Sequence, residues 1–106
     1  MTDKKLLELA AKAAGITGFW VDSGLNTQTD ATPKIWNPLI DDGDALRLAV
    51  KLEMQVVIGF RMVEAAVCSD SDEPPIRACE PKVGDICAAI RRAIVRAAAQ
   101  IIRSGT

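Results

Sequence analysis

The spacing of apolar residues divides the chain into short helical and extended segments. Near the N-terminus four apolar residues fall on one helical face: Leu6, Leu9, Ala10 and Ala13. This spacing predicts a helix that Thr2 caps and Gly15 ends. Residues 17–21 are aromatic and β-branched and lie between turn residues, so we expect a strand there. The polar segment 25–34 predicts a surface loop, either a plain connector, which we favour, or a binding loop.

Several signals separate a second helix from the chain before it. Pro38 lacks a backbone donor and disfavours helical geometry at Asn37, so Trp36 and Asn37 are expected to be extended or turning. Asp41 or Asp42 then supplies the N-cap, and their charges suit the positive end of the helix dipole. A helix cannot run through this segment, so the second helix starts after it.

The helix itself is predicted at 45–52, where apolar residues again recur at helical spacing. Leu46 and Val50 widen the apolar arc, so we expect this helix to be mostly covered. The acidic residues before it also suggest a calcium loop. A twelve-residue loop counted from Asp42 places Leu46 at a ligand position and Arg47 where the loop needs glycine. Helix capping is therefore the favoured interpretation.

Residues 55–68 carry apolar side chains on both faces of an extended chain. This pattern is typical of a strand that helices cover from above and below, with Gly59 as a bulge or bend. Turn residues at 69–75 and an extended segment at 76–80 predict that the chain then returns as a hairpin.

The chain contains three cysteines, Cys68, Cys79 and Cys87, without the spacing of a zinc site. If the predicted hairpin is centred between Glu73 and Pro74, Cys68 and Cys79 face each other. A redox pair is one interpretation of this geometry. Two small residues buried for packing is the favoured one, because cytosolic disulfides are rare and free cysteine is commonly buried.

The longest helix is predicted at 86–103, after Pro81, Gly84 and Asp85. Its apolar face has helical spacing: Ile86, Ala89, Ile90, Ala93, Ile94, Ala97 and Ile101. Three further residues extend that face: Val95, Ala98 and Ile102. The resulting arc is wider than that of a one-sided surface helix, so we expect part of it to contact a second copy of the chain in a homodimer.

In chain order these segments give α, β, loop, α, β, β, α. We expect a single domain over residues 1–106, an α+β three-layer helix/sheet/helix (ABA) sandwich with a small, mainly antiparallel sheet. A chain of 106 residues buries enough surface to fold without disulfides or metals.

Arg92, Arg96 and Arg103 lie on one narrow stripe of the last helix, with Arg91 at its margin. Such a stripe would suit a nucleic-acid backbone or a protein partner. Arginines late in a helix also suit the negative end of its dipole, and no aromatic residues are interleaved with them for base stacking. A solvated or salt-bridged face is the favoured interpretation.

Composition narrows the chemistry further. Thirteen basic and fourteen acidic residues give a net charge of −1, which requires neither a nucleic acid nor an anionic membrane as partner. The chain has no histidine, the usual general base near neutral pH, and no glycine-rich phosphate loop. We therefore expect no metal, no other cofactor and no enzymatic activity. The N-terminus lacks a signal-peptide h-region and a spanning segment, which predicts a cytoplasmic protein without a membrane partner.

Three blocks of the sequence resemble a family of small uncharacterised phage and prophage proteins related to the phage ABA-sandwich domain. The blocks are Trp36-Asn37-Pro38-Leu39, Asp41-Asp42-Gly43-Asp44-Ala45-Leu46-Arg47-Leu48-Ala49-Val50 and Arg91-Arg92-Ala93-Ile94-Val95-Arg96-Ala97-Ala98-Ala99. With the segment between them they cover roughly the last two thirds of the chain. The resemblance implies a helix/sheet/helix sandwich encoded by a temperate phage or its remnant in a bacterial genome. It implies no activity and brings no catalytic or ligand residues.

These observations favour a phage- or prophage-encoded accessory protein that acts by binding, in the cytoplasm of a bacterial host cell. The candidate partner-binding residues are Trp36, Asn37, Arg92, Arg96 and Arg103. The expected partner is a second copy of the chain or an unknown host or phage protein. The alternative is a nucleic-acid-binding regulator that uses the arginine stripe, and a small enzyme has the least support.

Overall fold

A computed structural model of the protein describes residues 2–27, 34–67 and 75–104. Within these ranges the chain forms helices and short strands in alternating groups. They are, in order, α1 (Asp3–Ala14), β1 (Phe19–Val21), β2 (Gly24–Asn26), β3 (Ile35–Trp36), α2 (Asp42–Lys51), β4 (Gln55–Ile58), β5 (Met62–Val67), β6 (Ile76–Pro81) and α3 (Ile86–Ser104).

Helices α1 and α2 begin at their predicted capping residues, and α3 begins directly after Asp85, as expected. The side chains of Thr2, Asp41 and Asp85 each accept a hydrogen bond from a backbone N–H in the first turn of α1, α2 and α3. Gly15 ends α1 in the left-handed conformation, with φ of 70°. None of these helices, in the described part of the chain, combines the length and apolarity needed to cross a membrane.

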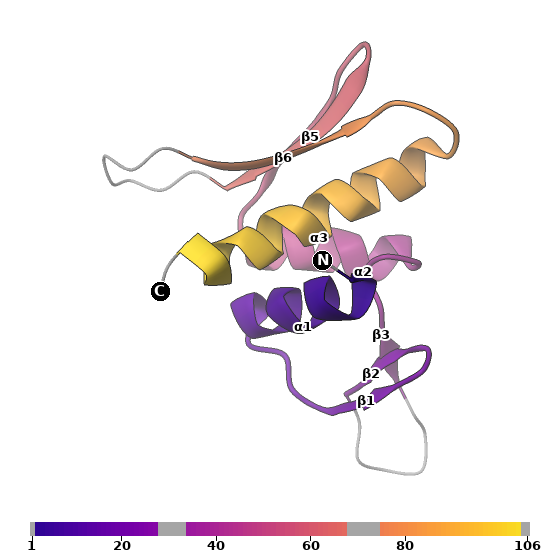
Figure 1. Ribbon diagram of the computed structural model, residues 1–106, viewed down its shortest axis with the longest axis vertical. Helices are drawn as coiled ribbons and strands as arrows, with labels where there is room; N and C mark the ends of the chain where they lie inside the picture. The colour runs from indigo at the N-terminus through magenta and orange to yellow at the C-terminus, as the bar shows by residue number, and fades with distance from the viewer. Residues whose placement is uncertain (1, 28–33, 68–74, 105–106) are drawn as a thin grey trace.

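The strands form two antiparallel sheets of three strands each, ordered β1-β2-β3 and β4-β5-β6. Figure 1 shows the two sheets at opposite ends of the molecule, with the helices between them. The expected α+β sandwich with antiparallel pairing is confirmed, although its strands form two small sheets where one was expected. Its helices occupy the middle, whereas the expectation was a helix layer on each face of one sheet.

Helix α3 forms the centre of the core. It packs against α1, α2, β5 and β6. Two runs of three residues in this helix are buried: Ala93, Ile94 and Val95, and then Ala97, Ala98 and Ala99. The many alanines let neighbouring elements approach closely. The wide apolar arc of this helix is therefore covered within one chain, and it no longer gives a reason to expect a dimer through α3.

Residues 55–68, expected as one strand, form two strands of a hairpin. The chain reverses at Gly59, whose backbone N–H donates to the Met62 carbonyl oxygen at 2.9 Å. A Cβ at Gly59 would lie 2.8 Å from that same oxygen, so this turn requires glycine. The prediction of a single strand was wrong because a glycine that permits a bulge also permits a complete reversal.

The expectation that helices cover both faces of residues 55–68 is also wrong. Val63 and Ala65 of β5 are buried, whereas all four residues of β4 are exposed. Helix α3 packs on β5 and β6, which leaves β4 at the margin of the helix layer. Leu46 and Val50 of α2 are exposed in the same way, so that helix is covered on one side only.

At the other end of the molecule, part of the expected surface loop belongs to a sheet. Residues 24–26 form β2, which pairs with both β1 and β3. The strand predicted at 17–21 is confirmed as β1, and residues 35 and 36 form β3. Residues 28–33 of the predicted loop lie outside the described residues.

Candidate functional site

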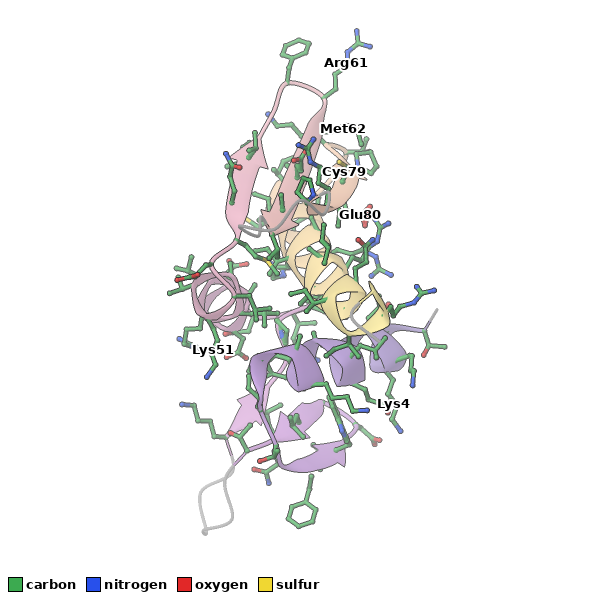
Figure 2. The ribbon with its side chains drawn as sticks, turned by 90° about the vertical axis from the view of Figure 1, so that its left-hand side faces the viewer. Lys4, Lys51, Arg61, Met62, Cys79 and Glu80 are labelled. Carbon is green, nitrogen blue, oxygen red and sulfur yellow. The ribbon has the colours of Figure 1, made fainter. Side chains whose placement is uncertain are left out.

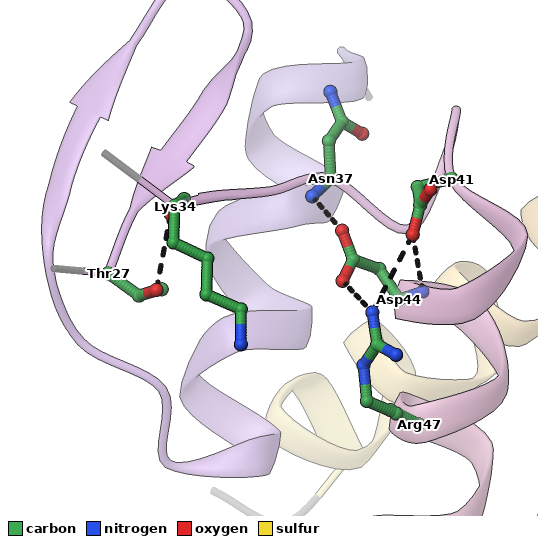
Figure 3. A network of polar contacts seen from close by, with 6 residues as sticks. All are labelled: Thr27, Lys34, Asn37, Asp41, Asp44 and Arg47. Atoms are coloured by element: carbon green, nitrogen blue, oxygen red, sulfur yellow. Dashed lines mark hydrogen bonds and ion pairs between the residues drawn. The ribbon is translucent and has the colours of Figure 1, made fainter. Parts of the chain in front are cut away.

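The first two candidate residues, Trp36 and Asn37, lie at the junction of β3 and α2. The side chain of Trp36 is 7% exposed and belongs to the core. Asn37 donates its backbone N–H to Asp44 Oδ2 at 2.9 Å (Figure 3). Its Nδ2 donates to the Ser23 carbonyl oxygen at 3.0 Å. Its Oδ1 accepts the Leu39 N–H at 3.1 Å. These contacts explain both residues by folding, and a partner-binding role for them stays a prediction.

Asp44 is the centre of the polar network in Figure 3. Its buried carboxylate also accepts a hydrogen bond from Arg47 Nη2 at 2.7 Å, and Arg47 lies 3.7 Å from Asp41 Oδ2. The Asp44 N–H donates to Asp41 Oδ2 at 2.8 Å. The acidic cluster therefore caps α2 and joins it to β3. Within the described ranges, no group of three His, Cys, Asp or Glu residues is arranged to hold a metal ion.

The arginine stripe of α3 meets an acidic residue of β6. Arg92 Nε lies 3.4 Å from Glu80 Oε1, and Arg96 Nη1 lies 3.1 Å from Glu80 Oε2. Arg92 Nη2 also donates to Asp3 Oδ1 of α1 at 2.9 Å, and Arg96 Nη1 to the Cys79 carbonyl oxygen at 3.0 Å. Figure 2 shows Glu80 on the strand that lies beside α3. The stripe therefore ties α3 to both α1 and β6.

The structure brings all three candidate arginines together. Arg92, Arg96 and Arg103 line one shallow hollow of about 330 Å³, which also includes Glu80 and Gln100. Three guanidinium groups and one carboxylate line this hollow, and the Asp3 carboxylate pairs with Arg92 beside it. Asn37 lines a different hollow, which it shares with residues of α1 and β1. The two groups of candidate residues therefore do not form one site.

The hairpin register from which the pairing of Cys68 with Cys79 was derived is wrong. The register of β5 and β6 places Glu64 opposite Cys79, and the Cys79 thiol donates to Glu64 Oε2 at 3.7 Å. Cys79 is exposed, so the expected burial for packing is wrong as well. Cys68 itself lies outside the described residues. The error arose because the turn was assumed to be centred on Glu73 and Pro74.

An apolar patch on the β4–β5 hairpin was missed by sequence reasoning. It consists of five exposed side chains, here called the hairpin patch: Val56, Val57, Ile58, Phe60 and Met62. Phe60 is 91% exposed. Figure 2 shows the hairpin extending beyond the helices, with Arg61 pointing away from the molecule at its tip. The signal in the sequence is the absence of charge over 54–60, which was interpreted as burial on both faces.

Comparison of the chain with protein-family models, curated proteins and solved structures finds no significant match.

Proposed function

We propose that this protein is a non-enzymatic interaction module that binds a protein partner through the hairpin patch. The observation that carries the proposal is the exposure of five apolar side chains on a single hairpin, with Val56 and Ile58 on one face of β4 and Val57 on the other. Clusters of exposed apolar side chains mark interaction sites, and aromatic and methionine side chains such as Phe60 and Met62 are favoured in interfaces. Pairing of β4 with β5, whose other edge pairs with β6, holds the patch on an ordered sheet.

The biological setting belongs to the same proposal. The protein is an accessory protein encoded by a phage or prophage and acts in the cytoplasm of a bacterial host cell. Support for this setting comes from the sequence blocks at 36–39, 41–50 and 91–99, which resemble a family of small phage and prophage proteins.

Affinity capture from infected or induced host cells tests the interaction role without assuming a partner. We expect wild-type chain to retain specific proteins and Phe60→Lys to lose them, because a charged side chain at the centre of an apolar interface is costly to bury. Phe19→Lys is the matched control, since Phe19 is 69% exposed but lies on the other sheet. Identical protein sets from wild type and Phe60→Lys would contradict the proposal.

A second candidate function is nucleic-acid binding through the arginine stripe. The hollow that gathers Arg92, Arg96 and Arg103 favours it, because a concave positive surface attracts phosphate groups. The ion pairs of Arg92 and Arg96 with Glu80 weigh against it, since those pairs must be broken or shared when a phosphate binds. We therefore place this function second.

A further inference from the structure

The open edge of β4 offers backbone groups to a further strand. In the described part of the chain β5 is the only strand that pairs with β4. The hydrogen bond from Gly59 N–H to the Met62 carbonyl oxygen fixes the phase of this ladder. Because bonded and non-bonded pairs alternate in an antiparallel ladder, Val57 directs its N–H and C=O groups to β5. Val56 and Ile58 then direct theirs away from β5, to the open edge.

The side chains of β4 do not protect this edge. Edge strands are commonly protected by charged residues, proline or bulges, which prevent pairing with another chain. Residues 55–60 contain no charged residue and no proline, and β4 has three consecutive β-branched residues. All four residues of β4 are exposed. An edge of this kind is a template for strand addition.

The segment around β4 is complementary to itself in the antiparallel direction. A two-fold axis at Val57 places Val56 opposite Ile58 of a second copy, so the outward backbone groups of both residues bond reciprocally. Charge favours the same direction, because Glu53 precedes β4, Arg61 follows it, and both are exposed. Antiparallel pairing brings each Glu53 near Arg61 of the other copy, whereas parallel pairing sets like charges side by side.

We infer that β4 of one copy pairs antiparallel with β4 of a second copy and joins two three-stranded sheets into a sheet of six strands. This inference rests on the proposed function and names the first partner of the hairpin patch. Val56 and Ile58 lie opposite Ala65 and Val63, which are buried on the face that α3 covers. The second copy extends this apolar row and covers side chains that α3 leaves exposed.

Val57→Lys tests the inference at the symmetry axis, where it places two ammonium groups opposite each other. We expect the full wild-type chain to dimerise with concentration in sedimentation equilibrium, and Val57→Lys to weaken the dimer at least about tenfold. Val21→Lys is the matched control, because Val21 (46% exposed) and Val57 (43% exposed) both lie on edge strands. It leaves the dissociation constant unchanged. Circular dichroism checks that each variant is folded.

Charge reversal tests the direction of pairing. Glu53→Lys or Arg61→Glu alone sets like charges together at both ends of the shared ladder, and we expect each to weaken the dimer about tenfold. The double variant Glu53→Lys/Arg61→Glu restores unlike pairs and returns the dissociation constant to within about threefold of the wild-type value. A double variant that dimerises no better than the single variants overturns the antiparallel register.

Two other outcomes overturn the dimer itself: a wild-type chain that is monomeric at every concentration, and a dimer that Val57→Lys leaves unchanged. The proposed interaction role is judged separately, by whether Phe60→Lys removes captured proteins. A monomeric wild type whose captured proteins are lost in Phe60→Lys therefore overturns self-pairing and leaves the interaction role supported.

Discussion

The two edges of the β4-β5-β6 sheet differ in how they meet their surroundings. Strand β6 carries Arg77, Glu80 and Pro81, and Glu80 is held by two arginines of α3. Strand β4 carries no charged residue and no proline. Charges and proline on an edge strand disfavour pairing with another chain, so one edge of this sheet is protected and the other is open.

The exposure of β4 does not come from a lack of apolar partners in the sheet. Val56, Ala65 and Ala78 lie opposite one another across the three strands, on the same face. Ala65 and Ala78 are buried and Val56 is not, because the helix layer ends before it reaches β4. The position of a strand relative to α3, rather than its sequence, decides its burial.

The largest expected difference in stability is between a charge placed at Ala78 and the same charge placed at Val56, the two ends of the row formed with Ala65. Ala78→Asp puts a carboxylate at a position that is 2% exposed, and we expect it to lower the free energy of unfolding by about 3 kcal/mol. Val56→Asp places the same charge on β4, where water reaches it, and is expected to cost less than about 1 kcal/mol. Urea denaturation of both variants measures the difference. Equal losses would contradict the difference in burial between the two edges.

A smaller effect is expected from removing the acidic partner of the arginine stripe. Glu80→Ala leaves Arg92 and Arg96 without their shared carboxylate, and we expect a loss of about 1–2 kcal/mol in the free energy of unfolding. Glu64→Ala is the control, because the Glu64–Arg77 pair is longer, at 3.8 Å, and more exposed. Its loss is expected to stay within about 0.5 kcal/mol. A Glu80→Ala variant as stable as Glu64→Ala would show that the protected edge does not depend on these ion pairs.

Arg77→Val removes a charge from the protected edge and should make β6 resemble β4. We expect the free energy of unfolding to change by no more than about 0.5 kcal/mol, because Arg77 is exposed. Light scattering at increasing protein concentration should then show association beyond the wild-type level. Scattering that did not rise would contradict a protective role of Arg77 at the β6 edge.

The smallest effect is expected in nucleic-acid binding. Since Arg92 and Arg96 are engaged by Asp3 and Glu80, we expect weak retention on heparin and little change in an Arg92→Ala/Arg96→Ala variant. Elution at several salt concentrations measures this. Strong retention that falls steeply with salt and is lost in the double variant would instead favour the nucleic-acid function.

Local sequence signals predicted the helices well, because their causes are local. Thr2, Gly15, Asp41 and Asp85 act within one helical turn, so their capping roles are visible in the sequence. The apolar periodicity of α3 likewise indicated its buried face. What the periodicity could not indicate is which elements cover that face, and this is why a second copy was expected where α1, α2 and the β4-β5-β6 sheet lie.

The hairpin patch was missed for a related reason. A strand covered by helices and an open edge strand that pairs with another chain both lack charged residues. An uncharged apolar run therefore has the same sequence pattern in either case. At Gly59 the sequence allowed a bulge or a turn, and only the pairing of β4 with β5 distinguishes them. The role of the arginine stripe was easier to predict, because arginine side chains favour ion pairs. Glu80 and Asp3 are the partners in the structure.

The central place of α3 has a consequence for how the protein is made. Translation proceeds from the N-terminus, so α1, α2 and the six described strands leave the ribosome before residues 86–104 do. Until then these elements lack the helix that lies between them, and their apolar faces are open to chaperones or to neighbouring nascent chains. The core around α3 therefore cannot form until residues 86–104 have emerged.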